Sequence, residues 1–208
     1  IAGTIAAQES PLWMRYCTIS PDGTTIAFTY KGDIYTVPST GGQATQITTN
    51  PAYDTTPIWS PDGKQIAFAS DRMGSMDVFI VSSEGGTPQR LTTYSGSEKP
   101  VAFKDDTHLL FTTYLMPAAE DAGFPSGQFQ QIYEVATTGG RPVMFSSMPM
   151  ESISINKDGA MLYHDKKGYE DYWRKHHVSP IARDVWMYTP NATPAYQKQT
   201  TFGGEDRE

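Results

Sequence analysis

A set of turn and strand signals recurs four times along the chain, and this repeat limits the possible folds more than any other feature. It is clearest in residues 57–93, where four short strands are each followed by a turn signal, the first being Pro61-Asp62-Gly63. In such a turn proline presets φ and glycine accepts a positive φ. Four antiparallel strands joined by tight hairpins make one meander sheet, which is the blade of a β-propeller.

Three landmarks of this unit advance together at intervals of 40 to 54 residues. They are the aspartate of the first turn, the start of the third strand and the Gly-Gly pair of the second turn. In chain order they are Asp22, Asp62, Asp105 and Asp158; Asp33, Asp77, Gln131 and Asp184; and Gly41-Gly42, Gly85-Gly86 and Gly139-Gly140. The repeat predicts an all-β propeller of four-stranded antiparallel blades, at about residues 13–49, 57–93, 100–147 and 151–201.

The residues at the two ends of the sequence indicate how many blades the propeller has and in which cellular compartment it lies. Residues 200–208 match the linkers that lead into the second and third blades, so we expect the domain of residues 10–208 to belong to a larger propeller. A closed ring of four blades is the alternative, since propellers contain roughly 4–8. Residues 1–9 begin with small apolar residues, typical of the end of a signal peptide or of a closing strand. The first interpretation predicts a periplasmic or secreted bacterial protein.

Composition excludes several classes of partner. The net charge of −7 is spread along the chain without a basic run, which argues against nucleic acid. No apolar stretch is long enough to cross a membrane. Cys17 is the single cysteine, so no internal disulfide can form, and we expect it to be a buried residue of the first strand.

The connection between the second and third strands is short in the first two blades and long in the last two, at residues 112–130 and 164–183. Insertions at one position of a repeat emerge on one face of the assembly. The second insertion concentrates aromatic and charged residues, which are enriched in binding hot spots. The candidate binding residues are Tyr169, Tyr172, Trp173, Arg174, His176 and His177. The alternative is that the aromatic residues only anchor the loop, and adjacent histidines are a poor metal site.

The sequence contains no motif that predicts catalysis. It has no G-x-S-x-G elbow, glycine-rich phosphate loop or H-E-x-x-H motif, so we expect no catalytic residue, metal or cofactor in this chain. Asp22, Asp62 and Asp158 are expected to accept hydrogen bonds within their own turns. The strand-start aspartates Asp33, Asp77 and Asp184 are expected to be structural as well, paired with turn amides.

The repeat SPDGKQIAFASDR-x-G-x-x-DVFIV, followed by GG-x-x-x-RLT, resembles TolB and the tricorn-like and prolyl-oligopeptidase-like propellers. Segments 128–188 and 197–207 resemble more narrowly the N-terminal propeller of bacterial tricorn-like serine peptidases, especially secreted enzymes of Bacteroidetes. That resemblance covers nearly the whole chain from about Ser10. It implies a non-catalytic domain that gates or steers peptides and contacts the peptidase domains of the same polypeptide. The alternatives are a TolB-like periplasmic scaffold that binds proteins and a propeller enzyme with its site in the central channel.

Overall fold

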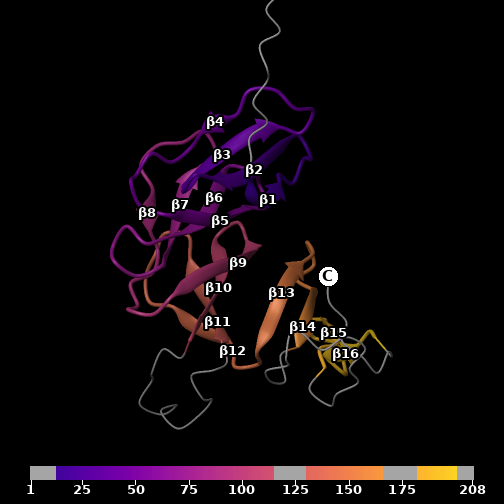
Figure 1. Cartoon of the computed structure of the whole chain (residues 1–208). Helices are drawn as coiled ribbons and strands as arrows, with labels where there is room; N and C mark the ends of the chain where they lie inside the picture. Colours follow the sequence, from indigo (N-terminus) through magenta and orange to yellow (C-terminus); the bar gives the residue numbers. More distant parts are fainter. Residues whose placement is uncertain (1–12, 115–129, 166–181, 201–208) are drawn as a thin grey trace, which may run out of the picture.

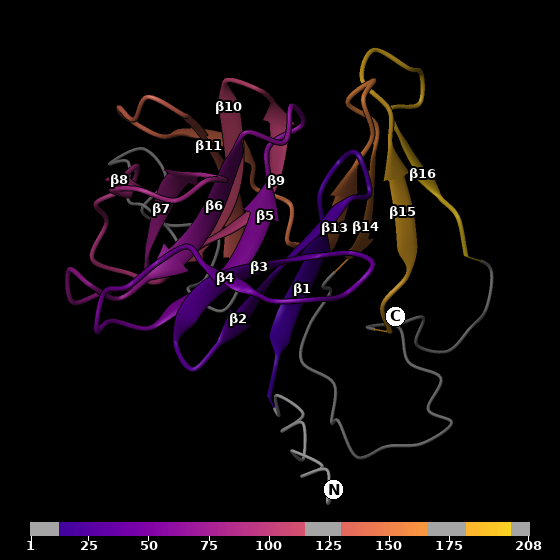
Figure 2. The ribbon, with the colours of Figure 1, turned by 90° about the horizontal axis from the view of Figure 1, so that it is seen from above.

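The computed structural model describes residues 13–114, 130–165 and 182–200, and within them the chain is built of strands without a helix. The strands form four separate four-stranded antiparallel sheets. Each sheet is one blade, and consecutive blades pack face to face (Figure 1). The first strand of each blade lies toward the middle of the assembly and the fourth lies at the outside (Figures 1 and 2). The predicted all-β propeller of four-stranded blades is therefore confirmed.

The strands follow one another in sequence order within every blade. Blade 1 contains β1 (Arg15–Ile19), β2 (Thr25–Tyr30), β3 (Asp33–Pro38) and β4 (Thr45–Gln46). Blade 2 contains β5 (Asp54–Trp59), β6 (Gln65–Ser70), β7 (Asp77–Ser82) and β8 (Gln89–Arg90). Blade 3 contains β9 (Glu98–Asp105), β10 (His108–Tyr114), β11 (Gln130–Ala136) and β12 (Val143–Ser146). Blade 4 contains β13 (Met150–Ile155), β14 (Met161–Asp165), β15 (Val185–Tyr188) and β16 (Tyr196–Lys198).

The first turn of a blade is closed by a side chain that accepts backbone amides. In blade 2, Asp62 accepts the amide of Lys64 at 3.0 Å and the Ser60 hydroxyl at 2.7 Å, and Gly63 has φ +71. Asp22 does the same in blade 1. The expectation for Asp158 is wrong, because in blade 4 the amides of residues 158 and 160 donate to Asn156, both at 2.9 Å. Asn156 occupies the place of the serine in the other turns, and its amide oxygen can reach both donors.

The inner strands are irregular. β1, β5 and β13 each contain a register shift in their pairing with the second strand. A residue inside each shift has positive φ: Tyr16 at 53, Thr56 at 51 and Ser152 at 51. Bulges of this kind bend a strand and increase its twist. Cys17 lies in the bulge of β1 and is exposed, contrary to expectation, because most residues of β1 face solvent.

The interface between two neighbouring blades, or seam, is formed by side chains that alternate between the two faces of each strand. Each blade presents an aromatic pair, one residue from the second strand and one from the third, to the blade before it. Phe68 and Phe79 of blade 2 stack with ring centroids 6.0 Å apart and pack on Ala27, Ile34 and Ile47 of blade 1. Period-2 alternation places small aliphatic residues on the opposite face of the same strands.

The next two seams repeat this arrangement. Phe111 and Tyr133 of blade 3 stack at 5.9 Å and pack on the aliphatic face of blade 2, formed by Ala67, Val78, Ile80 and Leu91. Tyr163 and Trp186 of blade 4 pack in the same way on Leu110 and Ile132 of blade 3. The corresponding pair of blade 1, Phe28 and Tyr35, stacks at 5.9 Å on the face turned away from blade 2. At the other end of the array, Leu162 of blade 4 is exposed on the face turned away from blade 3.

We predict that Phe68→Ala destabilises the fold by about 3–5 kcal/mol, because the ring is fully buried at the first seam and the change leaves a cavity. Ile19→Ala is the matched control, since Ile19 is 57% exposed and its truncation is expected to cost less than about 1 kcal/mol. Equilibrium denaturant unfolding measures both. A loss below about 1 kcal/mol for Phe68→Ala would mean that blades 1 and 2 do not pack as described.

Candidate binding face

The insertions that the sequence analysis singled out emerge from the same end of their blades. In blade 3, Tyr114 pairs with Gln130 at the base of the first insertion. In blade 4, Asp165 accepts the amide of Asp184 at 2.8 Å and the indole N–H of Trp186 at 3.0 Å at the base of the second. The six candidate binding residues, Tyr169, Tyr172, Trp173, Arg174, His176 and His177, lie outside the described residues.

On this face the aspartates that begin the third strand in blades 1 and 4 are held by a threonine just after the fourth strand of the same blade. The Thr48 hydroxyl accepts the amide of Ile34 at 3.0 Å and donates to Asp33 at 3.3 Å. In blade 4, Thr200 makes the same two contacts with the amide of Val185 and with Asp184. The aspartates are structural as expected, but the partner of Asp33 and Asp184 is a threonine hydroxyl rather than a turn amide, and Asp77 instead accepts the Ser75 hydroxyl and pairs with Arg90.

A residue of the fourth strand itself, two positions before the threonine, also binds the strand-start aspartate. It is neutral in blade 1, where Gln46 donates to Asp33 at 3.0 Å. It is basic in blades 2 and 4, where Arg90 pairs with Asp77 at 2.8 Å and Lys198 pairs with Asp184 at 2.7 Å. Burial raises the pKa of Asp33 and of Asp77, and the Arg90 guanidinium opposes that rise at Asp77.

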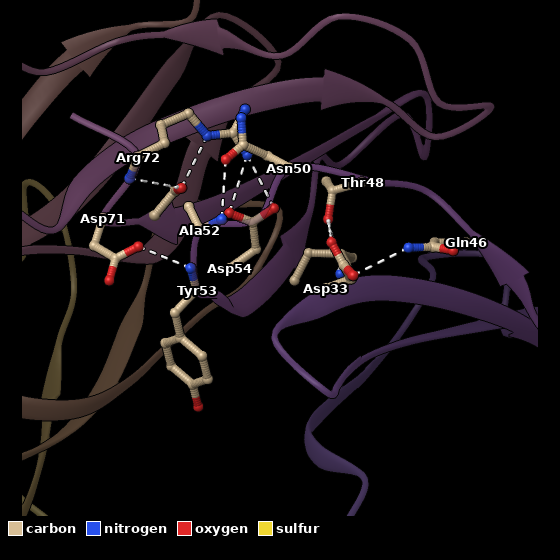
Figure 3. Close-up of polar contacts among 11 residues, drawn as sticks. Asp33, Gln46, Thr48, Asn50, Ala52, Tyr53, Asp54, Asp71 and Arg72 are labelled. Carbon is tan, nitrogen blue, oxygen red and sulfur yellow. Dashed lines mark hydrogen bonds and ion pairs between the residues drawn. The ribbon is translucent and has the colours of Figure 1, made fainter. Parts of the chain in front are cut away.

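At the seam between blades 1 and 2, Arg72 is the central residue (Figure 3). Its guanidinium holds both carboxylate oxygens of Asp54, at 2.9 and 3.0 Å, and its Nε donates to Ser70. The guanidinium also lies 4.6 Å from the ring centre of Phe79. Asp54 is fully buried, so this ion pair, in which one guanidinium nitrogen, Nη2, contacts both carboxylate oxygens, supplies the compensation that a buried carboxylate requires.

The segments around Arg72 are tied to the linker between blades. Asp71 accepts the amide of Tyr53 at 2.7 Å, and Asn50 accepts the amide of Ala52 at 3.0 Å (Figure 3). Beside them is an open pocket of 600 Å³ that includes Arg72, Met73 and Arg90 among its lining residues. The face therefore offers a preformed surface in which arginine side chains are already oriented by buried acids.

The seam between blades 2 and 3 is arranged differently. Glu98 occupies the place of Asp54 at the start of the inner strand and is fully buried. Neither carboxyl oxygen has hydrogen-bond geometry with a residue of the described part, although the Thr92 hydroxyl and the Tyr94 amide lie near enough to favour the charged form. Burial and the charge of Asp77 raise the pKa of Glu98 to about 7, against the opposing effect of Arg90. Asp77 and Glu98 therefore share one arginine, Arg90, at this seam.

These contacts position loops and carry no recognisable reaction chemistry. Across the described ranges, no group of three or more His, Cys, Asp or Glu side chains could hold a metal ion. The sequence analysis did not identify Arg72, Asp54 or Glu98. A signal for the two acids was present, because both stand at the same position of the repeat, the first residue of an inner strand. The partner of each acid depends on which arginine side chain reaches it, and the repeat pattern does not specify that.

A family model described as the tricorn protease N-terminal β-propeller domain matches residues 11–208. Among curated proteins, tricorn protease homolog 1 of Streptomyces coelicolor is 34% identical over 88 residues, which are 42% of this chain and 8% of that protein. The chain spans between 8% and 26% of the length of the first curated relatives it matches.

Two solved structures have a similar fold. The tricorn protease superposes with a TM-score of 0.70 at 20% identity, covering 94% of this chain and 19% of that chain. TolB from Acinetobacter baumannii superposes with a TM-score of 0.63 at 19% identity, covering 92% of this chain and 45% of that chain. At these identities the likeness concerns the fold alone. No helix in the described part of the chain is long and apolar enough to cross a membrane.

We predict that Glu98→Gln changes the pH dependence of stability. Because the folded state keeps the Glu98 proton up to a pKa of about 7 and the unfolded chain releases it near 4.5, the free energy of unfolding of the wild type falls as pH rises through this window. Glutamine cannot titrate. The free energy of unfolding of the variant therefore rises relative to that of the wild type by at most about 3 kcal/mol between pH 4.5 and 8.

Denaturant unfolding at constant ionic strength measures the difference between variant and wild type at each pH. Asp62→Asn is the control, because hydrogen bonds from the Lys64 amide and the Ser60 hydroxyl lower the pKa of Asp62. Its effect should be constant between pH 5 and 8. A Glu98→Gln difference that does not change with pH would contradict the assignment.

Proposed function

Because this chain belongs to the tricorn protease N-terminal β-propeller family, we propose that it is the non-catalytic propeller of a secreted tricorn-like serine peptidase, where it gates or steers peptide substrates. The match of the family model over residues 11–208 carries this proposal. Two further observations support it. Both long insertions emerge on one face of the array, and the same face presents arginine side chains held by buried acids. A peptide or an adjoining domain of the same polypeptide is the partner that such a face suits.

Within this face, Trp173 and Arg174 of the second insertion are the proposed anchors for the peptide. Aromatic and arginine side chains contribute large contact areas and dominate binding energies when they are desolvated. The bases of the insertion are held by the contacts of Asp165 with Asp184 and Trp186, so a substitution further along it leaves the blade intact. Tyr169, Tyr172, His176 and His177 belong to the same proposed surface.

We expect the double substitution Trp173→Ala with Arg174→Ala to lower kcat/KM of the full-length peptidase for an extended peptide about 30-fold, the equivalent of about 2 kcal/mol. A tripeptide substrate, too short to reach the insertion, should be cleaved at an unchanged rate. The matched control is Lys166→Ala with Lys167→Ala in the same insertion, which should leave both rates unchanged. If the anchors only fix the loop, the double variant instead lowers Tm and does not affect the extended peptide selectively.

A TolB-like scaffold that binds proteins in the periplasm is the second candidate, because the fold superposes on TolB over 92% of this chain. The two candidates differ in whether the complete polypeptide carries a catalytic serine. In either case the location we propose is the bacterial cell envelope or the medium, supported by the likeness of the fold to TolB.

A fluorophosphonate probe, applied to separated cell fractions, tests both points. We expect it to label the full-length polypeptide in the periplasmic or secreted fraction and to leave the isolated 208-residue chain unlabelled. Absence of labelling on an active, folded full-length protein would favour the scaffold. Stoichiometric labelling of the isolated chain would overturn the non-catalytic assignment.

A further inference from the structure

A second open pocket, of 720 Å³, lies between blades 1 and 2 at the end of the array opposite the two insertions. Its walls come from the first turns of both blades, the outer strands of blade 1 and the second turn of blade 2. Three carboxylates line it, Asp22, Asp62 and Glu84, and no lysine, arginine or histidine is among the described residues of its wall. It is separate from the insertion-bearing face and plays no part in the function proposed above.

The corresponding place in the next seam is occupied by a side chain. Between blades 2 and 3, Gln89 reaches across and donates to the carbonyl of Thr138 at 2.9 Å. The equivalent residue of blade 1 is Thr45, which pairs with Thr36 as Gln89 pairs with Ile80. Threonine is too short to cross the seam, so the space that Gln89 fills in one seam is left as the pocket in the other.

The two seams also differ in the residue that faces this position from the following blade. Glu84 precedes Gly85-Gly86 as Thr138 precedes Gly139-Gly140, so the pocket has a carboxylate where the bridged seam has a threonine. The amide of Glu84 donates to Ser82, but its carboxylate makes no hydrogen bond or ion pair with a residue in the described ranges. Glu84 is therefore available to a ligand.

The other two carboxylates add negative potential to the pocket. A hydrogen bond from the Ser20 hydroxyl lowers the pKa of Asp22, and the Lys64 amide lowers that of Asp62, so both stay ionised well below neutral pH. Lys64 lies 3.3 Å from Asp62, on a side chain that is largely exposed. The three carboxylates of the lining therefore favour a positively charged ligand.

An aromatic wall narrows the choice of cation. Trp59 lines the pocket, and its indole N–H donates to the carbonyl of Thr18 at 3.3 Å, which fixes the orientation of the ring. A guanidinium is planar, so it can stack flat on an indole face and bind a carboxylate with two parallel N–H groups; an ammonium can also lie over an aromatic ring but lacks this planar fork. We propose that this pocket binds the side chain of an arginine in an extended peptide segment, with Glu84 as its ion-pair partner.

The proposal is tested on this chain with acetyl-Gly-Arg-Gly-amide and with the same peptide carrying citrulline, which keeps the shape of arginine without its charge. Binding is followed by NMR at the indole N–H of Trp59, assigned by its loss in Trp59→Phe. We expect saturable shifts with the arginine peptide and at least about tenfold weaker binding of the citrulline peptide, since a charge-assisted bidentate pair is lost.

Two substitutions distinguish binding of the peptide in the pocket from attraction of the peptide by the net charge of the chain. Glu84→Gln should weaken binding of the arginine peptide at least about fivefold through loss of the ion pair. Thr45→Gln, which copies the side chain that crosses the next seam, should abolish the shifts while Tm stays unchanged. Asp158→Asn is the matched control, because it removes an exposed carboxylate from the first turn of blade 4, and it should leave Kd unchanged.

Equal binding of the arginine and citrulline peptides would overturn the proposal. So would unchanged binding in Thr45→Gln, since the peptide would then lie outside the pocket. Glu84→Gln and Asp158→Asn weakening binding to the same extent would indicate attraction by net charge, and this outcome would also reject the site.

Discussion

The packing of one blade on the next is the constraint from which the rest of the structure follows. A four-stranded meander sheet has two faces, and burying only one of them leaves it marginal. In this chain the aromatic face of each blade lies on the aliphatic face of the blade before it, as with Phe68 and Phe79 on Ile34 and Ile47. Because side chains alternate along a strand, a shift of one residue in register would exchange the two faces and break both seams of the blade. The seams therefore hold every turn and loop at a defined place on one end or the other.

The polar residues at the ends of the strands build on these apolar seams. Where a buried acid at the start of an inner strand has its own arginine, as Asp54 has Arg72, the charge is compensated and the nearby loop is fixed. Where it has none of its own, as with Glu98, burial raises the pKa of the acid to about 7. The same repeat position thus gives a rigid ion pair in one seam and a titratable group in the next. Differences between seams, rather than the repeat itself, give each part of the surface its chemistry.

The sequence predicted the repeated features of the structure and missed those that occur once. The blades, the turn at Pro61-Asp62-Gly63 and the alternating core residues were predictable because each depends on local turn chemistry and period-2 patterning. Cys17 was placed wrongly, because the exposure of an inner strand depends on its neighbours in space and not on its own residues. The turn of blade 4 uses Asn156 in place of Asp158, because either side chain could accept the amides and only geometry decides between them. The pairing of Arg72 with Asp54 depends on two side chains 18 residues apart, at the ends of two neighbouring strands of blade 2, meeting in space.

The fixed direction of the seams has a consequence for solubility. Because every blade presents one kind of face forward and the other kind backward, the array is a head-to-tail stack with no built-in length. Its aromatic end carries the Phe28–Tyr35 pair, of which Phe28 is buried, and Leu162 lies exposed at the opposite end. If the aromatic pair of one copy became uncovered, it would match the aliphatic end of another copy, and the two would add in series, as subunits of a filament do. Closing the ring, or capping its ends with other protein surface, is therefore also what keeps a propeller of this kind from polymerising.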